Sequence, residues 1–285
     1  MRIPLSDCVI ADRGLPSCQN EAPNRVRDHR QMANALDVQR WTRPLRHRAK
    51  TFIGARPWLF FPIFRPRPAF DDLLVTRSTD LCIEGFPRSG NSFTVGAVEH
   101  AQSSPLRVAH HTHVPANAMR ACEWGIPTLV LIRNPKDAVV SVVALSKQVQ
   151  EKEHNAEDPA QRVSFQDHLW AWDIFYRSLI SHRDRMLVAL LGAVVEDMGD
   201  VIERVNDRFG TNFARFDHTP ENVAEVHSRQ GYHAGPSERR TGLKKETRAD
   251  FNEQLQTDAA LQDTLSAAET LYERFANDPE VVTNP

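Results

Sequence analysis

The sequence predicts an α/β fold in three layers, with a mainly parallel β-sheet flanked by helices. Two short apolar runs, LCIEG (81–85) and TLVLI (128–132), read as buried strands, and each precedes a turn and a helical pattern. A third apolar run (186–195) precedes a further helical pattern. Strands that alternate with helices favour parallel pairing, because a parallel connection needs a crossover. With 285 residues, 41% of them hydrophobic, the chain can bury one sizeable core.

The first 80 residues are expected to lie outside this alternating pattern. Residues 1–50 read as a weakly structured leader, strongly basic from residue 25, and 51–285 as the folded domain. Proline, arginine and phenylalanine are frequent over 51–80, which predicts an irregular connection. For its apolar stretch, TFIGARPWLFFPIF (51–64), we favour packing on the core, with weak contact to a membrane surface as the alternative.

The first strand leads into a glycine-rich turn, GFPRSGNS (85–92), and a predicted helix over 92–102. The turn matches the phosphate-binding pattern G-x-x-x-x-G-K-[ST] except that Asn91 replaces the lysine. Free amides at the start of such a helix attract anions. Arg88 adds a permanent cation three positions earlier. The turn therefore predicts a site for a phosphate ester.

The second strand ends in Arg133, where a nucleotide triphosphatase places an acidic Mg²⁺ ligand. A cation at this point repels Mg²⁺ and attracts a second phosphate. Ser141 follows eight residues after Arg133, in the first part of the helix predicted for 137–150. The residues thus predict two anion sites without a metal: one at the glycine loop, one at Arg133 and Ser141.

The rest of the chain supplies further elements of the same fold. The helix predicted over 163–182 is rich in aromatic residues. It is expected to pack in the core rather than line an acceptor pocket, because its apolar residues recur with the helical period. The polar segment 217–248 is expected to be a loop or lid. In order, we predict a helix over 163–182, a strand within 186–195, a helix over 199–210 ended by glycine, the polar segment 217–248 and a helix over 249–276.

Three motifs together resemble one family, the sulfotransferases that use 3′-phosphoadenosine 5′-phosphosulfate (PAPS). PRSGNSF (87–93) resembles their P-[KR]-S-G-[TN]-[ST]-[WF] loop, and RNPKDAVVS (133–141) their 3′-phosphate motif. HTHVP (111–115) resembles the K-T-H-[LV]-P segment of the cytosolic members. The motifs occur in family order across 81–145, and 194–210 resembles a further segment more loosely. The resemblance implies a P-loop NTPase-like sulfotransferase core, closest to the cytosolic type and its bacterial relatives.

The resemblance also implies roles for individual residues. His113 would be the general base, and Arg88 would stabilise the charge that develops on the leaving phosphate. Arg133 and Ser141 would hold the 3′-phosphate. The 5′-phosphosulfate would be cradled by Arg88, Ser89, Gly90, Asn91, Ser92 and Phe93.

Several assignments have alternatives. An acidic residue could be the base in place of His113, and HHTH (110–113) could bind a metal, although no further ligands at suitable spacing are evident. His111, where the cytosolic motif has lysine, could assist in neutralising charge. In GPSERRTGLKK (235–245), Arg239 or Arg240 could contact the 3′-phosphate; we assign Arg239. Trp58 and Phe213 are conceivable partners of the adenine ring.

The expected function is transfer of a sulfuryl group from PAPS to a hydroxyl or amine of a small molecule or carbohydrate, leaving 3′,5′-ADP, with no metal required. The alternatives are a divergent P-loop kinase that uses ATP and a non-catalytic module that binds nucleotide. No nucleic-acid partner is expected beyond the donor, and the oligomeric state is open. The four cysteines show no zinc or redox spacing, Cys82 reads as a buried small hydrophobe, and neither a secretory pattern nor an apolar run of 18 residues is present. These features predict a cytoplasmic protein.

Overall fold

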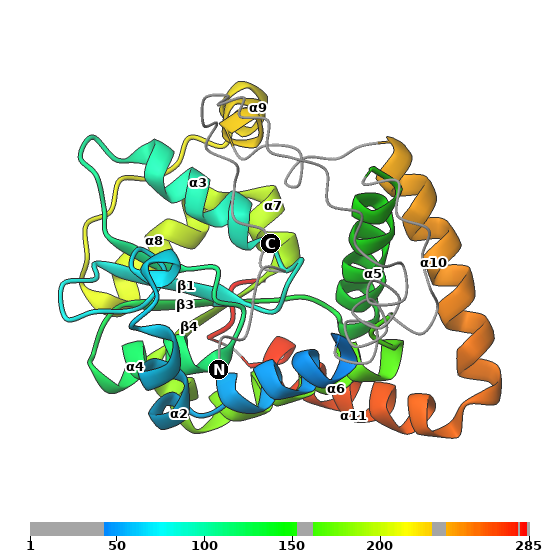
Figure 1. The fold of residues 1–285 in the computed structure, drawn as a ribbon. Coiled ribbons are helices and arrows are strands. Elements are labelled where there is room, and N and C mark those ends of the chain that lie inside the picture. The colour runs from blue at the N-terminus through cyan, green and yellow to red at the C-terminus, as the bar shows by residue number, and fades with distance from the viewer. Residues whose placement is uncertain (1–42, 153–161, 230–237, 279, 284–285) are drawn as a thin grey trace, which may run out of the picture. The chain divides into compact units, whose positions relative to one another are not determined.

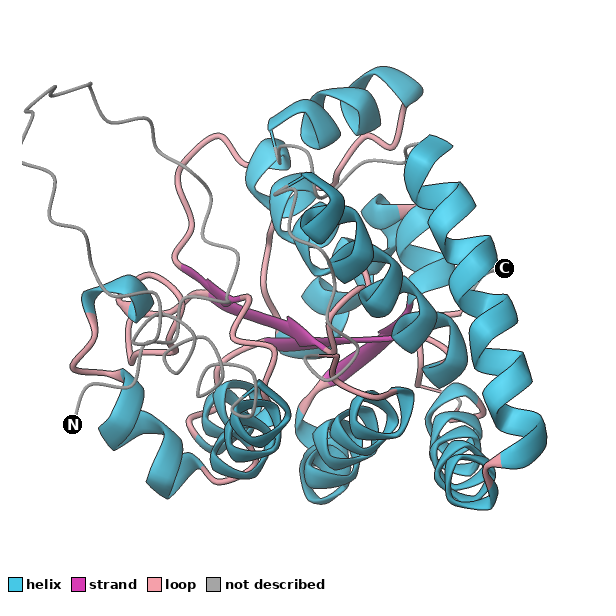
Figure 2. Ribbon diagram, turned by 45° about the vertical axis from the view of Figure 1, so that its right-hand side comes forward, coloured by secondary structure: helices cyan, strands magenta, loops and turns pink. Residues whose placement is uncertain are grey.

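A four-stranded, fully parallel sheet with the order β2-β1-β3-β4 lies at the centre of the structure (Figure 1). This computed structural model describes residues 43–152, 162–229, 238–278 and 280–283, which belong to one compact unit. Helices cover both faces of the sheet (Figure 2), so the predicted three-layer α/β fold is confirmed. The strands are β1 (Leu81–Gly85), β2 (Val108–His110), β3 (Thr128–Ile132) and β4 (Leu187–Leu190).

Both faces of the sheet are covered, since every residue of β1 and β3 is buried, and most of these residues are apolar. Leu129 and Leu131 point to one face, where they pack with Ile83 against helices α3, α7 and α8. Val130 and Ile132 point to the opposite face, toward α5, α6 and α11. This alternation explains why TLVLI is a continuous apolar run rather than an alternating one.

The helices follow the chain in a simple order. A helix covers residues 43–54, and the short 3₁₀ helices are η1 (Pro68–Phe70) and η3 (Ile180–Arg185). Helices α5 and α10 lie side by side (Figure 1). The remaining bounds are α2 (Pro57–Phe64), α3 (Asn91–Ala101), α4 (Pro115–Glu123), α5 (Pro135–Lys152), α6 (Phe165–Leu179), α7 (Leu191–Glu196), α8 (Met198–Phe209), α9 (Pro220–Arg229), α10 (Glu238–Thr257) and α11 (Ala259–Ala276).

Helix α6 is part of the core, as its aromatic pattern predicts, and it also holds the two loops that follow β1 and β3. The buried Tyr176 hydroxyl donates to the Leu131 carbonyl at 2.7 Å and accepts from the Phe86 amide at 3.2 Å. Trp172, also fully buried, donates its ring N–H to the Arg133 carbonyl at 3.2 Å. One helix therefore fixes the start of both predicted anion-binding loops.

The N-terminal part is more helical than expected. Residues 43–54 form a helix that crosses the expected boundary at residue 50, and α2 replaces part of the irregular connection expected over 51–80. The reason is packing: Phe60, Phe61 and Phe64 bury one face of α2 in a cluster with Cys82, which confirms that 51–64 covers the core and that this cysteine is buried. The rest of the expected leader, residues 1–42, lies outside the described residues.

The irregular loop expected over 217–248 is wrong for most of its described residues, because α9 and α10 occupy 220–229 and 238–248, and residues 230–237 lie outside the described part of the chain. The charged surface of α10 hides a buried face of four residues at helical spacing, Arg240, Leu243, Thr247 and Phe251. The expected strand at 186–195 is shorter, since the chain turns into α7 after Leu190. Strand β2 and helix α4 were not expected.

No helix in the described ranges combines the length and the apolar character that crossing a membrane would require.

The contact of α6 with the first loop gives a stability prediction. Tyr176→Phe removes one buried hydroxyl that both donates to the Leu131 carbonyl of β3 and accepts from the Phe86 amide of the loop. We expect a loss of about 1–3 kcal/mol in the free energy of unfolding. Urea denaturation should show a lower midpoint at an unchanged slope. An unchanged midpoint would mean that the hydroxyl does not secure the loop.

Candidate functional site

The candidate site lies at the carboxyl ends of β1 and β3, which are hydrogen-bonded neighbours with Ile83 opposite Leu129. From β1 the chain continues to β2 on one side and then returns to β3 on the other. In open parallel sheets, ligands bind beside the carboxyl ends of the strands, at the point where the strand order reverses. The loops that meet here are GFPRSGNS and RNPKD, the two predicted anion-binding turns.

The glycine loop is held in shape by its own polar groups. Gly90 has φ 99°, and a Cβ there would lie 2.9 Å from Leu191 Cδ1, so this position requires glycine. The buried Asn91 side chain turns back and donates to the carbonyls of Gly85 (3.3 Å) and Phe86 (3.1 Å). The asparagine that replaces the P-loop lysine therefore closes the loop with its side chain. The first amides of α3 have no acceptors within their own helix, which leaves them available to an anion.

Ser89, Ser92 and Phe93 surround the same turn with different environments. Ser89 is fully buried, with its hydroxyl 3.4 Å from that of Tyr176. Ser92 is partly exposed and bonded to His111. The Phe93 ring is buried and packs edge-on against Phe216, so this residue can offer an anion its amide but not its side chain.

The structure brings Arg88, Arg133 and Ser141 into one group. Arg88 Nε donates to the buried Ser141 hydroxyl at 3.2 Å, and Arg133 Nη1 donates to the Arg88 carbonyl at 3.1 Å. The two anion sites predicted from sequence are therefore neighbours, joined by the side chain and backbone of Arg88.

Helix α10 adds two further cations, Arg240 and Lys244, one turn apart. Arg240 is only 2% exposed and donates to Gln148 of α5 at 2.9 Å. Burial together with Arg240 and Arg133 lowers the pKa of Arg88 to about 10. Burial and the three arginines lower the pKa of Lys244 to about 8. Four cations so close together repel one another, and a multiply charged anion would relieve that repulsion.

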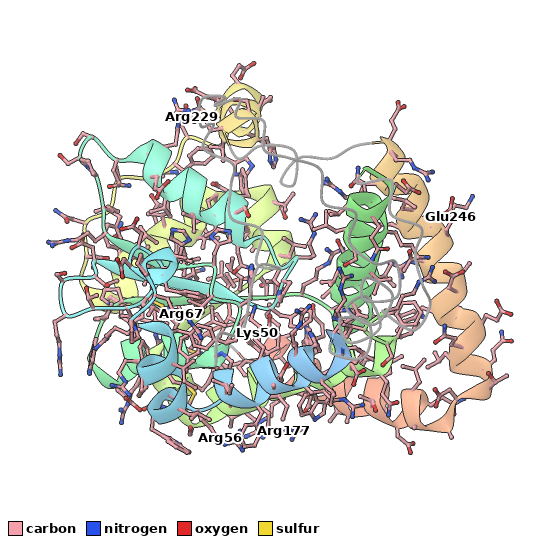
Figure 3. All side chains as sticks on the ribbon, viewed as in Figure 1. Lys50, Arg56, Arg67, Arg177, Arg229 and Glu246 are labelled. Carbon is pink, nitrogen blue, oxygen red and sulfur yellow. The ribbon has the colours of Figure 1, made fainter. Side chains whose placement is uncertain are left out.

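Arg239, the arginine assigned from sequence, has a different surrounding from Arg240. It is exposed on α10 and forms an ion pair with Glu151 of α5. Glu246, further along α10, lies on the outward side of the helix (Figure 3). Arg240 is on the inward face with Leu243 and Phe251, so the helical period of the 240–251 segment is the signal that separates the two arginines.

His113 stands beside the glycine loop. Its Nδ1 lies 3.2 Å from the Gly85 carbonyl, which can only accept, so Nδ1 carries the proton and Nε2 is left with its lone pair. Burial, followed by the nearby His111 and Lys50, lowers the pKa of His113 to about 3. The imidazole is therefore neutral at physiological pH. Lys50 comes from the helix over 43–54 and is labelled in Figure 3.

The neighbouring histidines connect this turn to the loop. His111 Nε2 lies 2.9 Å from the Ser92 hydroxyl, and its Nδ1 lies 2.5 Å from Nδ1 of His110. Burial lowers the pKa of both rings, that of His110 to about 4. His111 thus contacts the glycine loop as a neutral ring.

Backbone strain is concentrated in this site. In the described chain, the non-glycine residues with positive φ are Arg88 (70°), His111 (56°) and His113 (53°). Such conformations cost energy and persist where surrounding contacts impose them, which happens most often at functional sites. All three residues had been selected from sequence for their chemistry.

Trp58 and Phe213, the two residues suggested as partners of the adenine ring, lie in different parts of the fold. Trp58 is 71% exposed on α2, which packs on α4. Phe213 follows α8 and packs partly buried against the cluster that contains Phe216. Three further residues of the site are not singled out by any sequence motif. Glu84 accepts from the His113 amide, Lys50 lies near His113, and Lys244 lies near Arg88 and Arg133.

No protein-family model and no curated protein matches this sequence. Among solved structures, the chain is similar to mouse sulfotransferase SULT7A1 complexed with PAP, at 11% sequence identity and a TM-score of 0.38. The alignment covers 71% of this chain and 92% of that chain.

Because the four cations repel one another, we predict that they lower the free energy of unfolding of the unliganded protein. Lys244→Met should stabilise the unliganded protein at pH 7 by on the order of 1 kcal/mol, because it removes a half-buried charge from beside three arginines. Lys245→Met, at an exposed neighbouring position, is the control.

The effect has a defined pH dependence. The folded pKa of Lys244 is about 8, below its ordinary value of 10.5, so the wild type gains stability as pH rises from 8 to 10.5. The advantage of Lys244→Met should therefore shrink over that range in thermal unfolding. A destabilised variant at pH 7 would contradict the repulsion argument.

Proposed function

We propose that this protein transfers a sulfuryl group from PAPS to a hydroxyl or amine acceptor. The observation that carries the proposal is Arg133, which follows β3 where a nucleotide triphosphatase needs an acidic Mg²⁺ ligand, and which contacts the Arg88 backbone. A site with cations at both loops suits a donor with two separated anionic groups. ATP has its phosphates in one chain, whereas PAPS carries a 3′-phosphate and a 5′-phosphosulfate.

In this proposal the donor lies across the two loops. The amides of Gly90 to Phe93 and the Arg88 guanidinium bind the 5′-phosphosulfate. Ser89 supports the loop through the contact of its hydroxyl with that of Tyr176. Arg133 and Ser141 bind the 3′-phosphate. The α10 cations that face Arg88 add charge to the same region, and we propose Arg240 rather than Arg239 for this role because Arg239 pairs with Glu151.

The chemistry follows from the neutral His113 ring. Nε2 takes the proton of the acceptor O–H or N–H as that atom attacks sulfur, and the bond between sulfur and the bridging 5′-phosphate oxygen breaks. Arg88 stabilises the negative charge that this oxygen gains, as fixed charges do in preorganised sites. Binding of the anionic donor raises the pKa of His113 from its low value in the free protein, which makes the ring a stronger base when the donor is present.

Donor recognition is testable without knowing the acceptor. Isothermal titration in EDTA should show 3′,5′-ADP binding about 100-fold or more tighter than 5′-AMP, because the 3′-phosphate gains at least two charge-assisted hydrogen bonds. Arg133→Met should remove most of this difference. Equal affinity of the wild type for the two nucleotides, or a requirement for Mg²⁺, would overturn the assignment and favour an ATP-dependent enzyme.

A pair of variants separates the two arginines of α10. Arg240→Met should weaken 3′,5′-ADP binding, and Arg239→Met should have a much smaller effect. The reverse result would place Arg239 in the donor site.

The role of His113 is tested by His113→Asn, since an asparagine amide can still donate to the Gly85 carbonyl but cannot act as a base. With labelled PAPS and a panel of alcohols, phenols, amines and sugars, we expect kcat to fall about 10²–10⁴-fold. Affinity for 3′,5′-ADP should change by less than about threefold. Unchanged turnover would remove His113 as the base and direct attention to an acidic residue.

A further inference from the structure

Glu84 is a buried carboxylate at the end of β1, one residue before the glycine loop, and the proposed chemistry does not use it. Its side chain is 0% exposed. Strand residues alternate between faces, so Glu84 points away from Ile83, toward the face that α4 covers. A buried acid without a bound cation is costly, and it is retained only where hydrogen bonds compensate. Its contacts therefore indicate what the carboxylate does.

Both carboxylate oxygens accept hydrogen bonds from the turn that carries the histidines. Oε1 accepts from the Thr112 hydroxyl at 2.6 Å and from the Thr112 amide at 3.1 Å. Oε2 accepts from the His113 amide at 3.2 Å. Glu84 thus accepts from the backbone amides of two consecutive residues, Thr112 and His113.

Asn117 of α4 fixes the carboxylate from the other side. Its Nδ2 donates to Glu84 Oε1 at 3.0 Å and to the Leu73 carbonyl at 3.0 Å, and its Oδ1 accepts from the Val75 amide at 2.8 Å. Asn117 is itself fully buried. The carboxylate is therefore held rigidly between β1, α4 and the turn.

The turn needs such support because it is strained. His111 and His113 both have left-handed backbone conformations on either side of Thr112, the residue that Glu84 binds. These conformations are imposed by surrounding contacts rather than preferred locally. Within this turn, the Glu84 carboxylate is the group that bonds to both the Thr112 and His113 amides.

We propose that Glu84 is a positioning residue that holds the 111–113 turn in its left-handed form, so that His113 Nδ1 donates to the Gly85 carbonyl and Nε2 faces the reacting atoms. The proposal rests on the proposed function for the role of His113. Glu84 and Gly85 are consecutive in β1, so the strand that starts the anion loop also fixes both the backbone and the ring of the base. The position of the base relative to the donor is then set by one rigid element.

Glu84→Gln is the informative variant, because it keeps the shape and loses one acceptor. If the glutamine oxygen keeps the contacts with Thr112 and Asn117, its NH₂ group faces the His113 amide, and two donors oppose each other. Thr112→Val is a second variant, which removes the 2.6 Å hydroxyl contact without changing the charge. Thr128→Val is the control: it removes a buried hydrogen bond of the same sheet, to the Ile126 carbonyl, outside the histidine turn.

The first readout is independent of any reaction. Nitrogen-15 NMR of histidine-labelled protein, with His113 assigned by its loss in His113→Asn, reports which ring nitrogen carries the proton. We expect the Nδ1–H form in the wild type and in Thr128→Val, and a mixed or Nε2–H form in Glu84→Gln and Thr112→Val. An unchanged His113 tautomer in both site variants would overturn the proposal.

The second readout is kinetic. With 3′,5′-ADP affinity retained, kcat should fall about 10–100-fold in Glu84→Gln, as for other groups that orient a catalytic residue. Burial raises the pKa of Glu84 to about 7, against the hydrogen bonds from Thr112, Asn117 and His113. The wild-type kcat/KM should therefore decline below pH 7, and this decline should disappear in Glu84→Gln. An equal decline in both proteins would contradict the proposed role of the Glu84 carboxylate.

The two readouts separate this proposal from the proposed function. A changed tautomer in Glu84→Gln, combined with a wild type that transfers no sulfuryl group from PAPS, would leave the positioning role intact and refute the activity. Normal sulfuryl transfer by Glu84→Gln would refute the positioning role and leave the activity intact.

Discussion

The parallel pairing of β1 with β3 is the constraint on which the rest of the site depends. With Ile83 opposite Leu129 and Gly85 opposite Leu131, both strands end at the same edge of the sheet. The glycine loop begins at the end of β1, and Arg133 follows directly after β3. A slip of one residue would exchange the two faces of β3 and place apolar side chains against the wrong layer, so the hydrophobic core itself fixes how the two loops meet.

The core helix α6 converts this pairing into a defined geometry. Tyr176 bonds to β3 and to the first loop, and Trp172 bonds to the carbonyl of Arg133 at the start of the second. Because both contacts come from buried side chains of one helix, the distance between the loops is set by core packing. The repulsion between Arg88 and Arg133 therefore acts against two loops that are tied to a packed core helix.

The sequence allowed prediction of the parts of the site that depend on local chemistry. The strand, glycine turn and helix around Gly90, and the strand that ends in Arg133, could be identified because each pattern is contained in about 20 residues. Lys244 and Glu84 could not, because their roles come from neighbours distant in the chain. The many charged residues of α10 made its buried face difficult to recognise from the sequence. The sequence around Glu84 does not indicate its partners, Thr112 in the histidine turn and Asn117 of α4.

The strained backbone at Arg88, His111 and His113 connects these observations. Each residue carries a proposed catalytic or supporting role, and each is held in a conformation that its own side chain disfavours. For His113 the compensating contacts are known atom by atom: the amide bonds to Glu84 and the ring bonds to Gly85, both of β1. Arg88 is contacted by Arg133, directly after β3, and by Ser141 of α5. Strand β1 therefore fixes the base and also begins the loop of the leaving-group cation, while the register of β1 against β3 brings Arg133 to the Arg88 backbone.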